Sequence, residues 1–329
     1  MEINIRSERV SDYSSIANVN YEAFLGWRPD DHFVTEYILV DLLRHNPMYD
    51  PELSLVAEYN GRVVGHVFFS PFKFIVLGQE QLGVVLAPVA VIPEYQRKGI
   101  GKMLIEEGHR IAREKGFTFS LLCGHLEYYP KFGYKTEMFS LAGTDVSIRM
   151  EDFNSEGLTD RPVTGQDISW MLEAWKNQRG TDTLALFPGD YISLWSNHGF
   201  RCRCTVVEKN GRILGYARYV RTKPLIIKEL LAKDEDIPDL LAYLAWKEYG
   251  KIQCEMHIAL PVEKLQPSLT DTNNFELIDK RNADKHFMIK VLKQNSPIAA
   301  YCEQLEKGLI KPGIIVFPAM FDVDEGRDF

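Results

Sequence analysis

Residues 84–102 have the sequence VVLAPVAVIPEYQRKGIGK. The apolar run from Val84 to Ile92 is typical of a buried strand, and the polar turn after it ends in Gly99-Ile100-Gly101. From Met103 to Ala112, apolar residues recur at helical spacing. We therefore expect a strand that leads through a glycine-bearing turn directly into a helix.

The start of such a helix favours an anion, because its first backbone N–H groups lack intrahelical partners and the helix dipole is positive there. Arg97 and Lys98 add positive charge beside the turn. A P-loop would need a hydroxyl residue where Met103 stands, and a dinucleotide fingerprint would need a glycine in place of Leu104. A phosphate group is the expected ligand, but these two nucleotide motifs match poorly.

The segment Gln96–Gly101 fits the pattern Gln/Arg-x-x-Gly-x-Gly/Ala and resembles the GNAT N-acetyltransferases, which place a strand before it and a helix after it. About thirty residues later, Tyr129–Tyr134 resembles the second signature of that family, a tyrosine four residues before a glycine-aromatic pair. The resemblance covers residues 1 to about 150.

This resemblance implies an α/β fold with a mixed α+β sheet, the GNAT acyl-CoA N-acyltransferase fold. Its two parallel central strands splay apart, and the pantetheine arm of acetyl-CoA lies in the gap. Pro88 is a local reason for such a break, because proline cannot donate to a strand ladder. Residues 118–123 are the expected partner strand.

The resemblance also implies the cofactor, acetyl-CoA (coenzyme A), and a set of residues that bind it. These are Val89, Ala90, Val91, Gln96, Arg97, Lys98, Gly99, Ile100, Gly101, Lys102, Tyr128 and Phe132. Tyr129 is implied as the general acid that protonates the departing thiolate. The alternative is that Tyr128 and Tyr129 only pack against the coenzyme arm.

The general base stays open, because no titratable side chain lies between Val84 and Ile92. A water chain is one alternative, and the candidate side chains are Glu22, Glu36, Glu58, His66, His125 and Glu127. The resemblance to Eis-type members of the family adds the C-terminal carboxylate of Phe329.

The resemblance places the amine acceptor against residues 24–44. Aromatic and acidic side chains there would attract a cation, and the candidates are Phe24, Trp27, Asp30 and Glu36. A solvated helix cap is the alternative explanation of the acids.

A chain of 329 residues is long enough for two domains. Residues 57–65 resemble residues 207–215 at a constant offset of 150, each around an Asn-Gly hairpin signal. Residues 234–236 are three consecutive acids where a second phosphate turn would fall, and they would repel a pyrophosphate. We therefore expect a catalytic GNAT domain and a degenerate second copy. The expected ranges are 1–150 for the first domain, 151–165 for a linker, 166–293 for the second domain and 294–329 for a helix–strand tail.

Composition narrows the function classes. A formal net charge of −8 argues against a nucleic-acid partner and suits a cationic acceptor. No apolar run reaches the length of a membrane span, the start does not resemble a signal peptide, and five scattered cysteines suit reduced thiols without a metal site. The cytoplasm is therefore the expected location, and a homo-oligomer is left open.

Together these observations predict an acetyl-CoA-dependent N-acetyltransferase that acts by direct transfer on a small primary amine. Two alternatives remain, an enzyme that acetylates proteins or peptides and an acyl-CoA-binding module without turnover.

Overall fold

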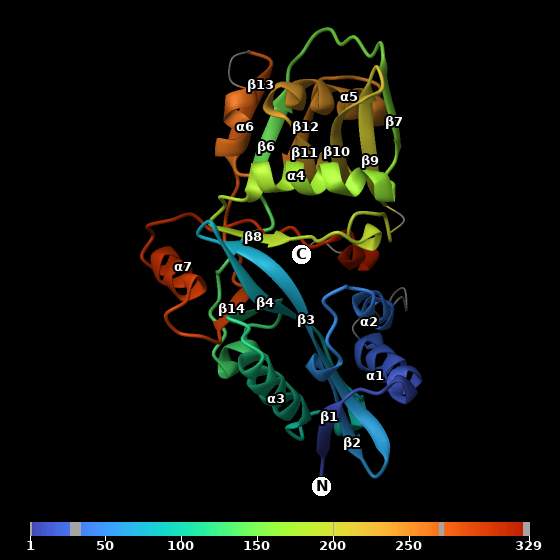
Figure 1. Ribbon diagram of the computed structural model, residues 1–329, viewed down its shortest axis with the longest axis vertical. Helices are drawn as coiled ribbons and strands as arrows, with labels where there is room; N and C mark the ends of the chain where they lie inside the picture. Colours follow the sequence, from blue (N-terminus) through green and yellow to red (C-terminus); the bar gives the residue numbers. More distant parts are fainter. Residues whose placement is uncertain (1, 27–33, 200, 270–272, 325–329) are drawn as a thin grey trace. The chain divides into compact units, whose positions relative to one another are not determined.

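The computed structural model describes residues 2–26, 34–199, 201–269 and 273–324. The chain forms two compact units, each with its own sheet (Figure 1). Unit 1 combines Met1–Met138 with Asp284–Lys307, and unit 2 combines Phe139–Ala283 with Gly308–Phe329. The units are interleaved along the chain, whereas the sequence suggested consecutive ranges. The reason is that residues 144–148, expected in the first domain, form a strand of the unit 2 sheet, and residues 287–291, expected in the second domain, form a strand of the unit 1 sheet.

The sheet of unit 1 has the strand order β1-β2-β3-β4-β5-β14. Neighbouring strands are antiparallel except β4 and β5, which run parallel. The strands are β1 (Asn4–Ser7), β2 (Ser54–Tyr59), β3 (Arg62–Val76), β4 (Gln79–Val91), β5 (Phe119–Cys123) and β14 (Phe287–Val291). The helices are α1 (Tyr13–Leu25), α2 (Glu36–Arg44), α3 (Ile100–Glu114) and α7 (Pro297–Glu306).

Strand β3 is buried along most of its length because helices cover both faces of the sheet. Its side chains alternate between the faces. His66 points to α1, where it meets Asn20, whereas Gly65 and Phe69 point to α3. A side chain at Gly65 would meet Ile100 and Leu104 at 3.1 Å, so the glycine lets α3 pack directly against the sheet.

The two central strands of unit 1 separate partway along their length. Strand β4 pairs with β5 only from Gly83 to Val85, although β4 continues to Val91. Pairing with β3 on the other side continues, with a register shift opposite Ala87-Pro88. The GNAT-type splay expected around Pro88 is therefore confirmed.

Unit 2 has the strand order β13-β6-β12-β11-β10-β9-β7. Its parallel pair, β11 and β12, is bonded from Leu225 to Ile227, as far as the last residue of β12, Ile258, whereas β11 continues to Ala232. The strands of this sheet are β6 (Thr144–Ile148), β7 (Leu158–Pro162), β9 (Cys202–Lys209), β10 (Arg212–Val220), β11 (Leu225–Ala232), β12 (Cys254–Ile258) and β13 (Phe275–Asp279). A further strand, β8 (Leu184–Phe187), falls within the residues of unit 2 but is not part of this sheet. The helices are α4 (Ile168–Arg179), α5 (Ile237–Tyr249) and α6 (Val262–Leu269).

Each unit contains the same side-chain clasp at an edge strand of its sheet, β1 in unit 1 and β7 in unit 2. In unit 1, Arg6 donates to Asp12 at 2.6 and 3.0 Å and to Glu58 at 3.0 Å. In unit 2, Arg161 donates to Asp167 at 2.8 Å through two nitrogens and to Glu208 at 2.7 Å. Both aspartates also accept a backbone N–H three residues earlier, at 2.8 Å in each unit.

The clasp extends the internal similarity beyond the hairpins. Those hairpins also match in backbone conformation, with positive φ at Asn60-Gly61 and at Asn210-Gly211. The expected repeat is thus visible in tertiary contacts as well as in sequence. Within the described residues, no helix combines the length and apolar character needed to cross a bilayer.

Two buried histidines in unit 1 generate a testable pH dependence. Burial lowers the pKa of His66 and of His109 to about 3, so both are neutral in the folded unit. In the unfolded chain each would bind a proton near pH 6.5. Stability is therefore complete above pH 6.5 and falls as the pH drops towards 3, by up to about 1.4 kcal/mol per pH unit for each group.

We expect the thermal midpoint of unit 1 to decrease as the pH is lowered from 7.5 to 5. In His109→Gln the decrease should be less steep. Scanning calorimetry at several pH values measures both slopes. Equal slopes in the two proteins would contradict the assignment of His109 as a buried neutral group.

Candidate active site

The turn between β4 and α3 presents unpaired backbone donors. Gly99 caps α3 with φ of 83°, and the first intrahelical bond runs from Met103 N–H to the Gly99 carbonyl at 3.1 Å. The N–H groups of Ile100, Gly101 and Lys102 therefore have no helical acceptor. No acidic residue lies in this first turn, and residues 96–99 are exposed. This arrangement suits a phosphate group.

Gln96 fixes the turn to the strand that precedes it. Its side-chain amide donates to the Val91 carbonyl at 3.0 Å. Arg97 adopts φ of 59°, and the exposed Lys98 ammonium lies 5.0 Å from the centre of the Tyr95 ring. The structure thus gives Gln96 a bond within the turn, in addition to the coenzyme contact expected from the sequence.

The splayed part of β4 can offer backbone N–H groups to a ligand. Ile92 N–H donates to the Val64 carbonyl of β3 at 3.0 Å. Donor directions alternate along a strand, so Ala90 N–H points to β3 while Val89 and Val91 N–H point away from it. Of the three expected residues, Val89 and Val91 are the ones whose amides face the separated side.

The second signature lies next to this turn. Tyr129 begins a short 3₁₀ helix, η4 (Tyr129–Phe132), and the Tyr128 hydroxyl lies 2.6 Å from where a side chain at Gly101 would begin. Phe132 is buried, with its ring 5.0 Å from that of Tyr128. The absence of a side chain at Gly101 therefore lets Tyr128 reach the first turn of α3.

Tyr129 is held by close ring contacts. Its ring fills the space beside Gly124, where a Cβ would lie 2.3 Å from it, and it packs edge-on against Tyr134 at 5.9 Å. Burial raises the pKa of Tyr129, so its hydroxyl stays protonated at neutral pH. Among the described residues, none forms a hydrogen bond with that hydroxyl. The group is therefore available to donate a proton.

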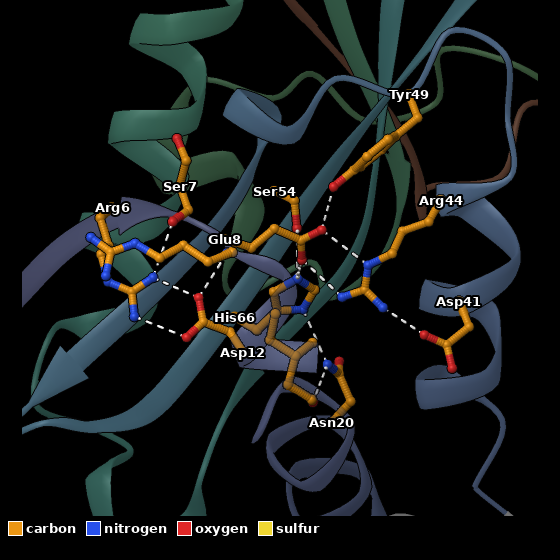
Figure 2. A network of polar contacts seen from close by, with 12 residues as sticks. Arg6, Ser7, Glu8, Asp12, Asn20, Asp41, Arg44, Tyr49, Ser54 and His66 are labelled. Carbon is orange, nitrogen blue, oxygen red and sulfur yellow. Dashed lines mark hydrogen bonds and ion pairs between the residues drawn. The ribbon is translucent and has the colours of Figure 1, made fainter. Parts of the chain in front are cut away.

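A buried polar network ties α1 and α2 to the opposite face of the sheet (Figure 2). Its centre is Glu8, which accepts from Arg44 at 3.0 and 2.8 Å, from Ser54 at 2.7 Å and from the Tyr49 hydroxyl. Burial alone would raise the pKa of Glu8, but the bonds from Arg44, Tyr49 and Ser54 lower it overall. Arg44 also stacks over the Tyr13 ring of α1 at 3.8 Å.

His66 extends this network to α1. The Asn20 amide donates to the Ile16 carbonyl at 2.9 Å and meets His66 Nδ1 at 3.1 Å, so Nδ1 is the acceptor and the proton is on Nε2. His66 Nε2 lies 3.0 Å from the Ser54 hydroxyl, which in turn donates to Glu8. With both nitrogens bonded and a pKa of about 3, His66 cannot serve as a general base at neutral pH.

The expected acceptor residues fall at the ends of α1 and α2. Phe24 lies in the last turn of α1 and Glu36 begins α2, both half-buried. Trp27 and Asp30 lie outside the described residues, as does Phe329. The role of all four candidates as acceptor contacts stays a prediction. Glu58, another candidate base, is bonded to Arg6.

Sequence reasoning missed the Glu8 network and a second buried relay. In this relay the Tyr134 hydroxyl shares hydrogen bonds with His109 at 2.9 Å and with Ser120 at 2.7 Å. A histidine inside an apolar run, as at His66, could have indicated a buried polar network, because a buried imidazole requires polar partners. The partners themselves are too distant along the chain to be identified by spacing.

The first prediction from this site concerns the turn. Gly99 and Gly116, at opposite ends of α3, both have positive φ and open space around them, so alanine strains the backbone similarly at each. We expect Gly99→Ala to weaken acetyl-CoA binding about tenfold, because it distorts the donor turn, and Gly116→Ala to leave binding unchanged. Isothermal titration calorimetry checks this. Equal affinities in both variants would contradict the turn as the phosphate site.

The second prediction concerns Glu8. Its side chain is 1% exposed and that of Arg44 8% exposed, so Glu8→Gln removes the buried countercharge of Arg44 and leaves it only the exposed Asp41. We expect a loss of about 3 kcal/mol in unfolding free energy. Asp41 bonds the same Arg44 at 2.5 Å but is 61% exposed, so Asp41→Asn should cost less than about 1 kcal/mol. Urea denaturation measures both, and equal losses would contradict the network's role.

Comparison with known proteins places part of the chain in a sequence family. Residues 4–136 match the acetyltransferase (GNAT) domain. The uncharacterized N-acetyltransferase YjhQ of Escherichia coli is 38% identical over 125 residues, which are 38% of this chain and 65% of YjhQ. YhbS of the same organism is 34% identical over 84 residues, 25% of this chain and 49% of YhbS. The chain thus spans between about half and two thirds of these curated relatives.

Solved structures resemble a larger part of the chain. A GCN5-related N-acetyltransferase from Anabaena variabilis has a TM-score of 0.63 at 15% identity, covering 89% of this chain and 73% of that one. A probable N-acyltransferase from Enterococcus faecalis has a TM-score of 0.62 at 13% identity, covering 89% and 73%. These likenesses concern the fold, and they confirm the mixed α/β class and the second GNAT-like domain. By sequence, residues 4–136 belong to the GNAT N-acetyltransferase family, and the likeness in fold extends over most of the chain.

Proposed function

We propose that unit 1 transfers an acetyl group from acetyl-CoA to the primary amine of a small molecule, by direct transfer in a ternary complex. The observation that carries the proposal is the end of β4–β5 pairing at Val85, with β4 continuing unpaired on that side towards the donor turn at Gly99. The strand gap, the turn and Tyr129 all follow the carboxyl ends of these two strands. In open α/β sheets this is the edge at which ligands bind.

The residues of the turn would bind the diphosphate of the coenzyme. Ile100, Gly101 and Lys102 supply backbone N–H groups, and Arg97 and Lys98 supply positive charge. The backbone N–H groups of Val89 and Val91 would donate hydrogen bonds to the extended pantetheine arm, in the way that a neighbouring strand would accept them. Tyr128 and Phe132 would bound the arm on the side of the second signature.

When bound, acetyl-CoA supplies an activated acyl thioester. Tyr129 would then donate its phenolic proton to the departing sulfur, since burial keeps the phenol protonated. Most of the rate would come from holding the amine against the carbonyl in the right orientation. With His66 excluded as a base and Glu58 bonded to Arg6, a water chain remains a route for the amine proton. The other remaining candidate bases are Glu22, Glu36, His125, Glu127 and the carboxylate of Phe329.

The acceptor class follows from charge and from the residues at the helix ends. A net charge of −8 favours a cationic amine, and Phe24, Trp27, Asp30 and Glu36 remain the proposed contacts. Acetylation of a protein or peptide is the nearer alternative, and binding without turnover is the more distant one. A location in the cytoplasm stays a prediction from the sequence.

Unit 2 is proposed as the degenerate copy. At the start of α5, Asp236 receives two 2.7 Å bonds from Arg212, and the acids Asp234 and Glu235 adjoin it. Carboxylates therefore occupy the place where unit 1 has glycine and unpaired donors. Like charge would repel a diphosphate there.

The test is turnover with a panel of aliphatic diamines and arylalkylamines, followed by release of the coenzyme thiol. We expect at least one amine to be acetylated, and Tyr129→Phe to lower kcat by about 10² with little change in acetyl-CoA affinity. Full activity of Tyr129→Phe would contradict the general-acid role. Tight acetyl-CoA binding without turnover of any amine or peptide would favour the binding module.

A further inference from the structure

The sheet of unit 1 includes a strand, β14, that follows the longer segment of unit 2, Phe139–Ala283, in the chain. Residues 284–307 lie outside the family match at 4–136, yet β14 pairs with β5 from Phe287–Cys123 to Val291–Phe119. The loop after β5 is bonded to β14 on both sides of the second signature. Gly124 N–H donates to the His286 carbonyl at 3.0 Å, and Lys135 and Ile289 exchange backbone bonds at 2.9 and 3.0 Å.

One side chain of β14 reaches the helix that carries Tyr129. Lys290 donates from Nζ to the carbonyl of Phe132, the last residue of η4. A cation at this position also interacts favourably with the carbonyl end of the short helix. The ammonium lies 3.7 Å from where a side chain at Gly133 would begin, so it sits at the bend that ends η4.

The same face of β14 adjoins the buried relay under Tyr129. Lys290 lies opposite Ser120 in the strand register, and Ser120 bonds the Tyr134 hydroxyl at 2.7 Å. Tyr134 is also bonded to His109 of α3 and supports the Tyr129 ring edge-on. Tyr129 therefore contacts the relay through the Tyr134 ring and begins the short helix whose last carbonyl binds Lys290.

We propose that Lys290 is a positioning residue for Tyr129. It fixes the carbonyl end of η4, so that the Tyr129 hydroxyl keeps a constant position relative to the strand gap. The inference rests on the proposed function for the role of Tyr129. The contact of Lys290 with the end of η4, called the clamp below, depends only on residues of unit 1. It also assigns a function to residues beyond the GNAT domain match, since they complete the site.

The test compares three variants of the full chain. Lys290→Met keeps the aliphatic stem and removes the donor, and Lys290→Arg restores a donor. Lys135→Met is the matched control, because Lys135 lies on the loop that carries η4 but its ammonium forms an exposed ion pair with Glu306. Hydrogen–deuterium exchange should be faster over residues 129–134 in Lys290→Met alone, with β3 unchanged in all three.

Turnover gives the second readout, with the panel amine that reacts fastest. We expect Lys290→Met to lower kcat about 10- to 100-fold while the KM for acetyl-CoA stays within about twofold, and Lys290→Arg to recover most of the loss. In a Tyr129→Phe background, Lys290→Met should cost almost nothing more, because the two residues act through one group. An equal loss in both backgrounds would overturn the proposal.

The failures of the two proposals are distinguishable. If Tyr129→Phe keeps full activity while Lys290→Met still speeds exchange over 129–134, the general-acid role fails and the clamp stands. If Tyr129→Phe loses activity while Lys290→Met matches wild type in exchange and kcat, the clamp fails and the proposed function stands.

Discussion

The structure of unit 1 depends on the loss of pairing between β4 and β5 after Val85. Two parallel strands that separate leave backbone N–H groups without acceptors, a state that a buried sheet does not tolerate without a partner. The separation also directs β4 into the turn at Gly99, and hence sets where the unpaired donors of α3 point. A ligand that is extended at one end and anionic at the other would satisfy both the N–H groups of the separated part of β4 and those of the first turn of α3.

The supports of this gap come from distant parts of the chain. On one face, Glu8 joins α2 to β2 and, through Ser54 and His66, to α1. On the other, the Tyr134 relay joins α3 to β5. Each network is buried and consists of groups that would be costly to leave unpaired. Both therefore fix helices to the sheet on either side of the proposed thioester position.

The sequence was informative wherever the determinant is local. The apolar run, Pro88, the glycines of the turn and the Asn-Gly hairpins are short patterns with one physical meaning each, and the corresponding structures are present. The placement of β6 in the unit 2 sheet and of β14 in the unit 1 sheet was not predictable. Both are short strands, and their pairing partners are distant in sequence. The Glu8 and Lys290 contacts were missed for the same reason, since each joins residues tens or hundreds of positions apart.

Backbone amide resonances of the deuterated full chain during titration with coenzyme A test the central claim most directly. The account predicts that shifts concentrate at residues 89–91 and 99–102, with residues 230–239 of unit 2 unaffected. Shifts centred on residues 230–239, or no response at residues 89–91 and 99–102 at saturation, would contradict it.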